Sequence, residues 1–282
     1  MSMVAVLAAC GGGSARTPVE ETVTAVRALP PDTSTVVEPA GLPAGFGAAF
    51  RLADTRARQL LYYQQCSAAV LGMRARGRFG AASTAPRAVY CTRTSEGVPL
   101  GGVYDIDSSF TAPRRLQLIR LDGAQPRWTQ PLDTTRIARA ARLVSQARAQ
   151  FAPRYRVQRG TFTIAPVVLD DGTIEAWALP QQTSLRDVVL GGDMALVRAA
   201  DGTPARLADR LTTWRRFSVP ATGTVVLRSR EAQVAAVQEL VLARTLAERG
   251  RTVQVVTGAA VSALVPGMDP SGSRYTWEHA KP

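Results

Sequence analysis

The sequence predicts an α+β domain, a largely antiparallel, hairpin-rich sheet with about three helices packed on it. Three observations predict this class. Segments with apolar residues at helical spacing are interspersed with short β-rich runs. Asp-Gly pairs separate neighbouring β-rich runs, and Gly supplies the positive φ that a tight hairpin turn requires. The chain has 282 residues, of which 46% are hydrophobic, so it can bury one large core.

The first predicted elements are a helix and a strand that each contain a cysteine. A helix is expected over about 48–70 and holds Cys66 near its end, whereas Ala88–Thr92 is a predicted strand that contains Cys91. The apolar positions that define the helix are Phe50, Ala53, Ala57, Leu60 and Leu61. This arrangement places one cysteine on the helix and the other on the first strand of the sheet.

The middle of the chain continues with two strands and a second helix. Val103–Asp107 and Arg115–Leu121 are predicted strands, and Asp133 is a good N-cap for the helix that follows Pro131. One face of this helix is apolar, formed by Ile137, Ala140, Ala141, Val144, Ala147 and Phe151. Four arginines lie mostly off that face: Arg136, Arg139, Arg142 and Arg148. We interpret the segment as an ordinary amphipathic helix.

Two hairpins give the clearest β signal. Tyr155–Leu169 and Thr173–Leu179 flank Asp170-Asp171-Gly172, and Met194–Ala199 and Thr203–Leu207 flank Asp201-Gly202. Three further elements complete the predicted core: Thr224–Leu227, a helix over about 230–249 that ends at Gly250, and Thr252–Thr257. We therefore expect one globular domain over 47–266 and a loose C-terminal tail over 267–282.

The N-terminus has a short apolar run, Met3 to Ala9, that ends at Cys10 and is followed by glycines. The order Leu7-Ala8-Ala9-Cys10 resembles the lipobox of bacterial lipoproteins. The resemblance implies a short signal peptide over 1–9, cleavage before Cys10 and acylation of that cysteine. Prolines in 10–46 then predict an extended tether, because proline lacks a backbone donor and disfavours helix.

The remaining two cysteines form an even pair. If Cys10 carries lipid, Cys66 and Cys91 are left for a disulfide, which persists in the oxidising compartment that the lipobox implies. Two buried free thiols are the alternative. Localisation at the cell envelope follows, with a lipid-anchored domain facing the periplasm or the outer surface.

Charge and motifs restrict the function. The net charge is +12, carried almost entirely by arginine, which attracts phosphate-bearing surfaces. The single histidine, His279, falls in the expected tail, so a Ser-His-Asp or Cys-His mechanism and a zinc site of several imidazoles are not expected. Neither GxxxxGK[ST] nor GxGxxG follows a strand. We expect no cofactor and no metal.

Carboxylates are the catalytic class that this reasoning leaves open. Asp105 and Asp107 lie two apart in a predicted strand and share a face, while Glu175 lies in an apolar strand beside Trp177. Such groups perform acid/base chemistry or bind a divalent cation, but solvent-facing strand ends explain them equally well.

A second resemblance covers Ile174–Phe217 and is to bacterial secreted proteins and lipoproteins of uncharacterised activity. Its residues are Trp177-Ala178-Leu179-Pro180, Gly191-Gly192-Asp193, Asp201-Gly202 and Arg215-Arg216-Phe217. It implies a hairpin-rich envelope domain and transfers no activity.

These observations favour a lipid-anchored envelope protein with a non-enzymatic binding or scaffolding role. Its expected partners are the membrane, through the lipid, and an anionic envelope polymer or another envelope protein. The alternatives are an envelope glycan hydrolase that uses Asp105, Asp107 and Glu175, and, ranked last, a basic nucleic-acid-binding protein. An exposed aromatic patch of Trp128, Trp177 and Trp214 would serve binding, although core packing is the expected use of each.

Overall fold

Four small sheets surround one long helix in this protein. The computed structural model describes residues 40–77, 87–93, 99–105, 116–120, 134–157, 162–169, 171–182, 184–199, 201, 203, 206–209, 214–231, 233–267 and 274–282. The strand orders are β1-β2-β3, β4-β5-β7-β8, β6-β9 and β10-β11-β12-β13. All pairs except β10 with β11 are antiparallel. The α+β class is confirmed, whereas the expected single sheet is wrong.

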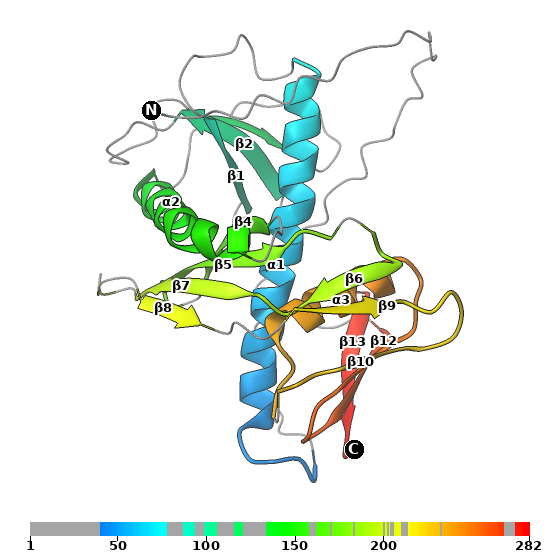
Figure 1. Ribbon diagram of the computed structural model, residues 1–282. Coiled ribbons are helices and arrows are strands. Elements are labelled where there is room, and N and C mark those ends of the chain that lie inside the picture. The colour runs from blue at the N-terminus through cyan, green and yellow to red at the C-terminus, as the bar shows by residue number, and fades with distance from the viewer. Residues whose placement is uncertain are drawn as a thin grey trace, which may run out of the picture.

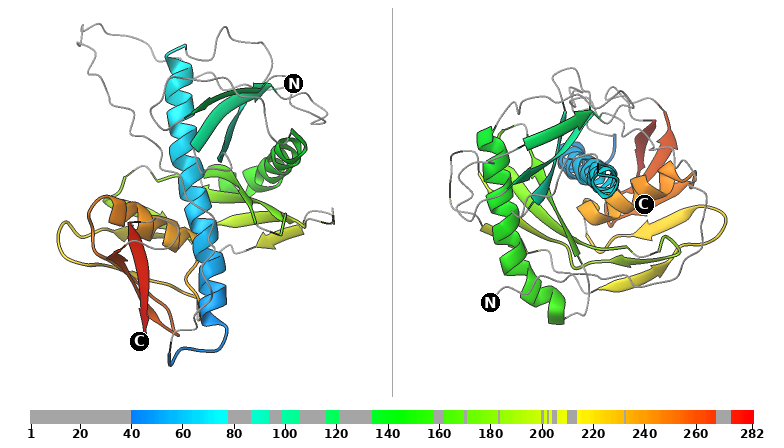
Figure 2. Two further views of the ribbon diagram at one scale, coloured as in Figure 1. Left: turned by 180° about the vertical axis from the view of Figure 1, so that it is seen from behind. Right: turned by 90° about the horizontal axis from the view of Figure 1, so that it is seen from above.

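The helix α1 (Phe46–Ala75) is the axis of the molecule and runs through its whole length (Figures 1 and 2). Its 30 residues span about 45 Å at 1.5 Å per residue. The helix follows Gly45, whose φ of 77° starts it from a left-handed turn. Its N-terminal half packs in the main core through Phe50, Ala57 and Leu60, and its C-terminal half packs in a separate cluster through Cys66. The helix predicted over 48–70 is therefore confirmed and is longer at both ends.

The first sheet covers the C-terminal half of α1. It contains β1 (Arg87–Arg93), β2 (Pro99–Asp105) and β3 (Leu116–Arg120). The strands β1 and β3 agree closely with their predictions, whereas β2 begins four residues before the predicted Val103–Asp107. The strand β1 carries Cys91, which is bonded to Cys66 of α1. The predicted disulfide is confirmed, and it joins the helix to the first strand as expected.

The central sheet lies between helices on both of its faces. It consists of β4 (Phe162–Val168), β5 (Ile174–Pro180), β7 (Met194–Arg198) and β8 (Arg206–Asp209). The helix α2 (Thr134–Val157) covers one face and α1 lies on the other (Figure 2, right). Every residue of β5 is buried, because both faces of that strand are covered.

Both predicted hairpins are confirmed, although one strand of each begins several residues later than predicted. In the turn between β4 and β5, Gly172 has a φ of 82° and donates its N–H to the Leu169 carbonyl at 3.0 Å. The predicted strand over 155–169 begins only at Phe162, because α2 continues through Pro153 to Val157. The strands β7 and β8 pair as the second predicted hairpin.

The C-terminal sheet contains β10 (Val225–Arg228), β11 (Val253–Val256), β12 (Val261–Pro266) and β13 (Tyr275–Ala280). The parallel pair β10 and β11 is connected through α3 (Val237–Glu248), which starts later than the predicted helix over 230–249. The expectation of a loose tail over 267–282 is wrong for its last part, because β13 pairs with β12 along its full length.

A two-stranded ribbon, β6 (Asp187–Leu190) with β9 (Arg215–Ser218), was not predicted. Each strand has only four residues, too few for a period-two pattern to be distinctive. Several predictions lie outside the described residues: the signal peptide, acylated Cys10, most of the tether, Asp107, Trp128 and the N-cap Asp133.

Candidate functional site

The buried charged side chains of α1 form the most distinctive chemical feature of the described residues. They face two different parts of the fold. Arg56, which is half-buried, is directed to the central sheet, whereas Asp54 is directed to α3 and β13 and lies near Arg58 of its own helix. Burying a charge is costly unless the charge is paired. The partners of each group therefore show whether its charge is used within the fold or is available for chemistry.

Glu175, one of the three carboxylates proposed for acid/base chemistry, lies in β5 and is only 2% exposed. Arg56 donates to it through Nε, at 2.8 Å from Oε2, and through Nη2, at 2.6 Å from Oε1. Trp177 Nε1 donates to Oε2 at 2.6 Å. These donors hold the carboxylate in place. These contacts favour a structural role for Glu175, as the link between α1 and the central sheet.

The structure does not bring the three proposed carboxylates together as a described site. Asp105 is the last residue of β2 and lies opposite Arg87 in the strand register. Asp107 lies outside the described residues. Trp177, which was considered for an exposed aromatic patch, is 3% exposed and packs in the main core, in agreement with the core packing expected of it.

Asp54 is the centre of a second network. Arg244 of α3 donates to it twice, with Nε 2.7 Å from Oδ1 and Nη2 2.6 Å from Oδ2. Trp277 of β13 donates its indole N–H to Oδ1 at 3.0 Å, and Arg58 Nε lies 3.6 Å from Oδ2. The Arg244 guanidinium also lies over the Trp277 ring, 5.9 Å from its centroid. This bidentate pair fixes α1, α3 and β13 relative to one another.

His279, the single histidine of the chain, is in β13 and not in a loose tail. Its Nδ1 lies 2.9 Å from Ser262 Oγ of β12, and its ring contacts the edges of Phe46 and Phe50 of α1. Burial lowers the pKa of His279, and the charge of Asp54 acts in the opposite direction. Ser262 is 2% exposed, and Asp54 receives its hydrogen bonds from Arg244 and Trp277. The cluster packs the helix against the sheet and does not present a hydroxyl to a substrate.

A third set of contacts attaches the β6–β9 ribbon to α3. Arg215 donates to Glu239 at 2.6 Å, and Glu239 in turn accepts the N–H of Ala236 at the start of the helix. The Gln238 side chain accepts the Gly191 N–H at 2.7 Å and donates to the Val189 carbonyl at 2.9 Å. Gly191 and Arg215 were named from the sequence within a resemblance, whereas Glu239, Gln238 and these contacts were missed, since no motif or periodic pattern connects the residues.

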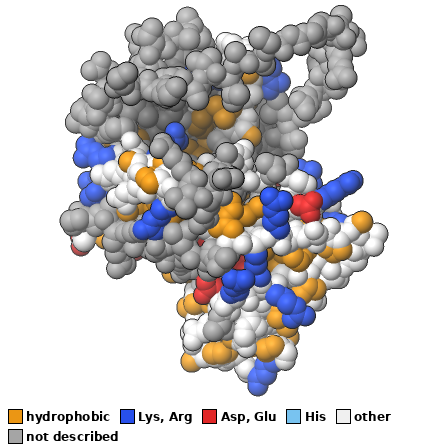
Figure 3. Space-filling view, in the orientation of Figure 1, with side chains coloured by type: hydrophobic (Ala, Val, Ile, Leu, Met, Phe, Trp, Pro, Cys, Tyr) orange, Lys and Arg blue, Asp and Glu red, His pale blue; other side chains and the backbone are white. Residues whose placement is uncertain are grey.

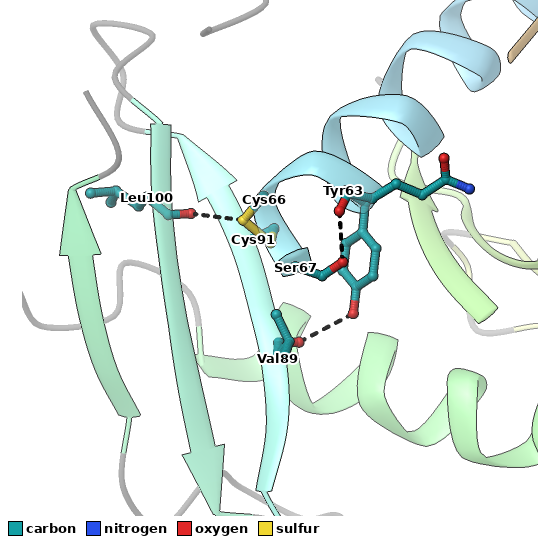
Figure 4. Close-up of a disulfide and its surroundings, with 7 residues drawn as sticks. Tyr63, Cys66, Ser67, Val89, Cys91 and Leu100 are labelled. Carbon is teal, nitrogen blue, oxygen red and sulfur yellow. Dashed lines mark hydrogen bonds between the residues drawn. A yellow bond between two sulfur atoms is a disulfide. The ribbon is translucent and has the colours of Figure 1, made fainter. Parts of the chain in front are cut away.

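The disulfide and its neighbours fix the upper part of α1 (Figure 4). Tyr63 donates its hydroxyl to the Val89 carbonyl at 3.3 Å, and the Leu100 carbonyl oxygen lies 3.9 Å from Cys66 Sγ. Burial raises the pKa of Tyr63 to about 12, although the positive charge of Arg148 opposes this shift. A covalent bond and a buried hydrogen bond thus join α1 to the edge strand β1.

Two further findings concern metals and membranes. Among the residues that the structure describes, no group of three or more His, Cys, Asp or Glu side chains is placed to hold a metal ion. Within the same part of the chain, no helix combines the length and the apolar character that crossing a bilayer requires.

Comparisons with known proteins add little. No family model matches this sequence, and no curated protein matches it. The Bacillus megaterium YpeB C-terminal domain is a solved structure that aligns with 75% of this chain and 97% of its own length, at 7% sequence identity and a TM-score of 0.19. A similarity this low carries no argument about the fold or the function of this chain.

Proposed function

We propose that this protein is a non-enzymatic binding or scaffolding protein of the bacterial cell envelope, anchored through a lipid on Cys10. The observation that carries the proposal is the disulfide between Cys66 and Cys91. Disulfides form and persist outside the cytoplasm and are rare within it. The bond therefore supports the compartment that the lipobox-like Leu7-Ala8-Ala9-Cys10 implies on separate grounds.

The contacts of the buried polar side chains support binding or scaffolding over catalysis. Glu175 is held by Arg56 and Trp177, and Asp54 is held by Arg244 and Trp277. The hydrogen bonds of these groups link α1 to the surrounding sheets and to α3. With its N-terminal half held by these contacts and its C-terminal half held by the disulfide at Cys66, the helix is a rigid frame from which outer surfaces can be presented.

The net charge of +12 supports an anionic partner, either an envelope polymer or the acidic surface of another envelope protein. Binding of this kind depends on long-range attraction. It should therefore weaken as salt screens charges over about 8–10 Å near physiological ionic strength.

Intact-mass analysis of the full chain, isolated from the membranes of a bacterial host, tests the anchoring. We expect a polypeptide that starts at Cys10, carries fatty acyl groups and lacks free thiols at Cys66 and Cys91. The matched control is Cys10→Ser, which should lose the acyl mass and be released from the membrane fraction by a high-salt wash, which screens surface charge, while it keeps the disulfide. Recovery of the unprocessed chain from the cytosol, without fatty acid and with three free thiols, would overturn the proposal.

A further inference from the structure

Every charged side chain of α2 is an arginine. Its 24 residues include six arginines and no aspartate or glutamate. No carboxylate on the helix itself can therefore neutralise them through pairs three or four residues apart. A helix of this composition projects positive charge wherever its arginines reach the surface.

The arginines of α2 reach the surface on the side away from the core. Leu143, Ala147 and Phe151 are buried against the central sheet, whereas Arg139 and Arg142 are exposed. These two arginines are three positions apart, so they lie on the same face of the helix. Arg148 is exposed at the edge of this face that is nearer to Tyr63 of α1. In Figure 3, blue side chains lie around the position of α2 and also over the middle and the lower part of the same face.

Among the side chains of α2 that the structure describes, none that is both large and apolar is exposed. The other exposed residues of the outer face are small or polar, such as Thr135, Ala149 and Pro153. An interfacial helix that inserts into a bilayer needs Trp, Phe or Leu on its lipid-facing side. The outer face of α2 is therefore suited to lie on a charged surface and not to enter it.

We infer that the outer face of α2, formed by Arg139 and Arg142 with Arg148 at its edge, binds the phosphate headgroups of an anionic bilayer. The inference rests on the proposed function, because the bilayer is the one in which the lipid on Cys10 would be inserted. A guanidinium presents its donors as a planar fork that matches two phosphate oxygens, which makes arginine suited to this ligand.

Chain length permits the anchor and α2 to engage the same membrane. Twenty-nine residues, 11–39, separate Cys10 from the first described residue, and an extended chain of this length reaches on the order of 100 Å. The helix α1, at about 45 Å, is shorter than this reach. An anchored chain also raises the effective concentration of headgroups near the domain. Charge complementarity and proximity therefore favour the bilayer over a polymer or a nucleic acid.

Vesicle flotation with the purified full chain carrying Cys10→Ser tests the inference, because any binding then comes from the protein surface alone. The vesicles contain phosphatidylglycerol and phosphatidylethanolamine, with pure phosphatidylcholine as the neutral reference. Each arginine near an anionic surface is worth about fivefold in partitioning. We expect Arg139→Gln/Arg142→Gln to lose about 25-fold in binding, and Arg139→Lys/Arg142→Lys to recover most of it.

The matched control is Arg228→Gln/Arg230→Gln, which removes the same charge from two exposed arginines at the end of β10. We expect vesicle binding by this control to fall by no more than about twofold. Its two arginines lie outside α2, so their loss acts only through the net charge of the protein, which salt screens. Thermal unfolding of each variant, followed by circular dichroism, should give transitions close to the parent.

Three results would overturn the inference. The first is an equal loss of vesicle binding in the two double variants, and the second is equal binding of the parent to neutral and anionic vesicles. The third is binding to polyphosphate or duplex DNA that depends on Arg139 and Arg142, without binding to vesicles. Failure here is separable from failure of the proposed function. An acylated Cys10 with no vesicle binding overturns only the role of α2, whereas an unmodified Cys10 with intact vesicle binding overturns only the anchoring.

Discussion

Asp54 of α1 accepts two hydrogen bonds from Arg244 of α3, at 2.7 and 2.6 Å, although 190 residues separate the two side chains. Both residues are less than 10% exposed. Removal of one partner from a buried ion pair costs more than the pair itself contributes, because the other charge is left without a counter-charge in a medium of low polarity.

Asp54→Asn should lower the free energy of unfolding by about 3–5 kcal/mol, because the Arg244 guanidinium stays buried without its counter-charge. Urea unfolding followed by tryptophan fluorescence measures the change. Glu278→Gln is the matched control, since Glu278 is exposed on β13, and it should change stability by less than about 0.5 kcal/mol. Equal stability of Asp54→Asn and the control would contradict the role assigned to this pair.

Glu175→Gln should destabilise the protein by about 3 kcal/mol, because Arg56 loses the carboxylate that it contacts through Nε and Nη2. Combining it with Arg56→Met should restore part of the loss, since the unpaired charge is then absent as well. Chemical unfolding of the two single variants and the double variant gives the coupling energy. A stable Glu175→Gln protein that had lost glycan hydrolysis would favour the hydrolase alternative instead.

Reduction of the disulfide should lower the free energy of unfolding by about 3 kcal/mol, the chain-entropy estimate for a bond that closes a separation of 25 residues. Thermal unfolding with and without a reductant measures this change. The Cys66→Ala/Cys91→Ala variant supplies the control, because its melting temperature should not respond to reductant. A response of that variant would show that another thiol is responsible.

His279 should make stability depend on pH between about 7.5 and 5.5. Burial lowers its pKa in the folded state, so the unfolded chain binds a proton first as the pH falls through about 6.5. Stability is therefore complete above that pH and decreases as the pH falls toward the lower, folded value. Because the chain has one histidine, His279→Gln should remove the slope in this window. A variant with an unchanged slope would assign the effect to another group.

Local signals in the sequence predicted the local parts of the fold. The spacing of Phe50, Ala57 and Leu60 identified α1, and Asp171-Gly172 identified the hairpin between β4 and β5. The cysteine pair was correct because its two residues lie on elements that were themselves predicted. Each of these signals lies within one element or one turn, where steric and hydrophobic preferences act directly.

The elements that were missed depend on partners distant in the chain. Tyr275, Trp277 and His279 alternate along β13, but the segment follows Pro- and Gly-containing residues near the C-terminus and therefore resembled a tail. Its strand structure comes from pairing with β12 and from contacts with Phe46 and Phe50 of α1, more than 200 residues earlier. The ion pairs Arg56–Glu175 and Asp54–Arg244 join residues that are far apart in the sequence at no regular spacing. They form only when α1 packs against the central sheet and α3, so no sequence pattern predicts them.

The position of α1 also has a consequence for the order in which the chain can fold. The helix is made early, but Asp54 receives its hydrogen bond from Trp277, 223 residues downstream. During synthesis, its buried carboxylate must stay hydrated until almost the whole polypeptide has emerged. Because these contacts form late, the apolar face of the newly made helix stays exposed to solvent for a long time. Folding should therefore depend on chaperones that cover this face.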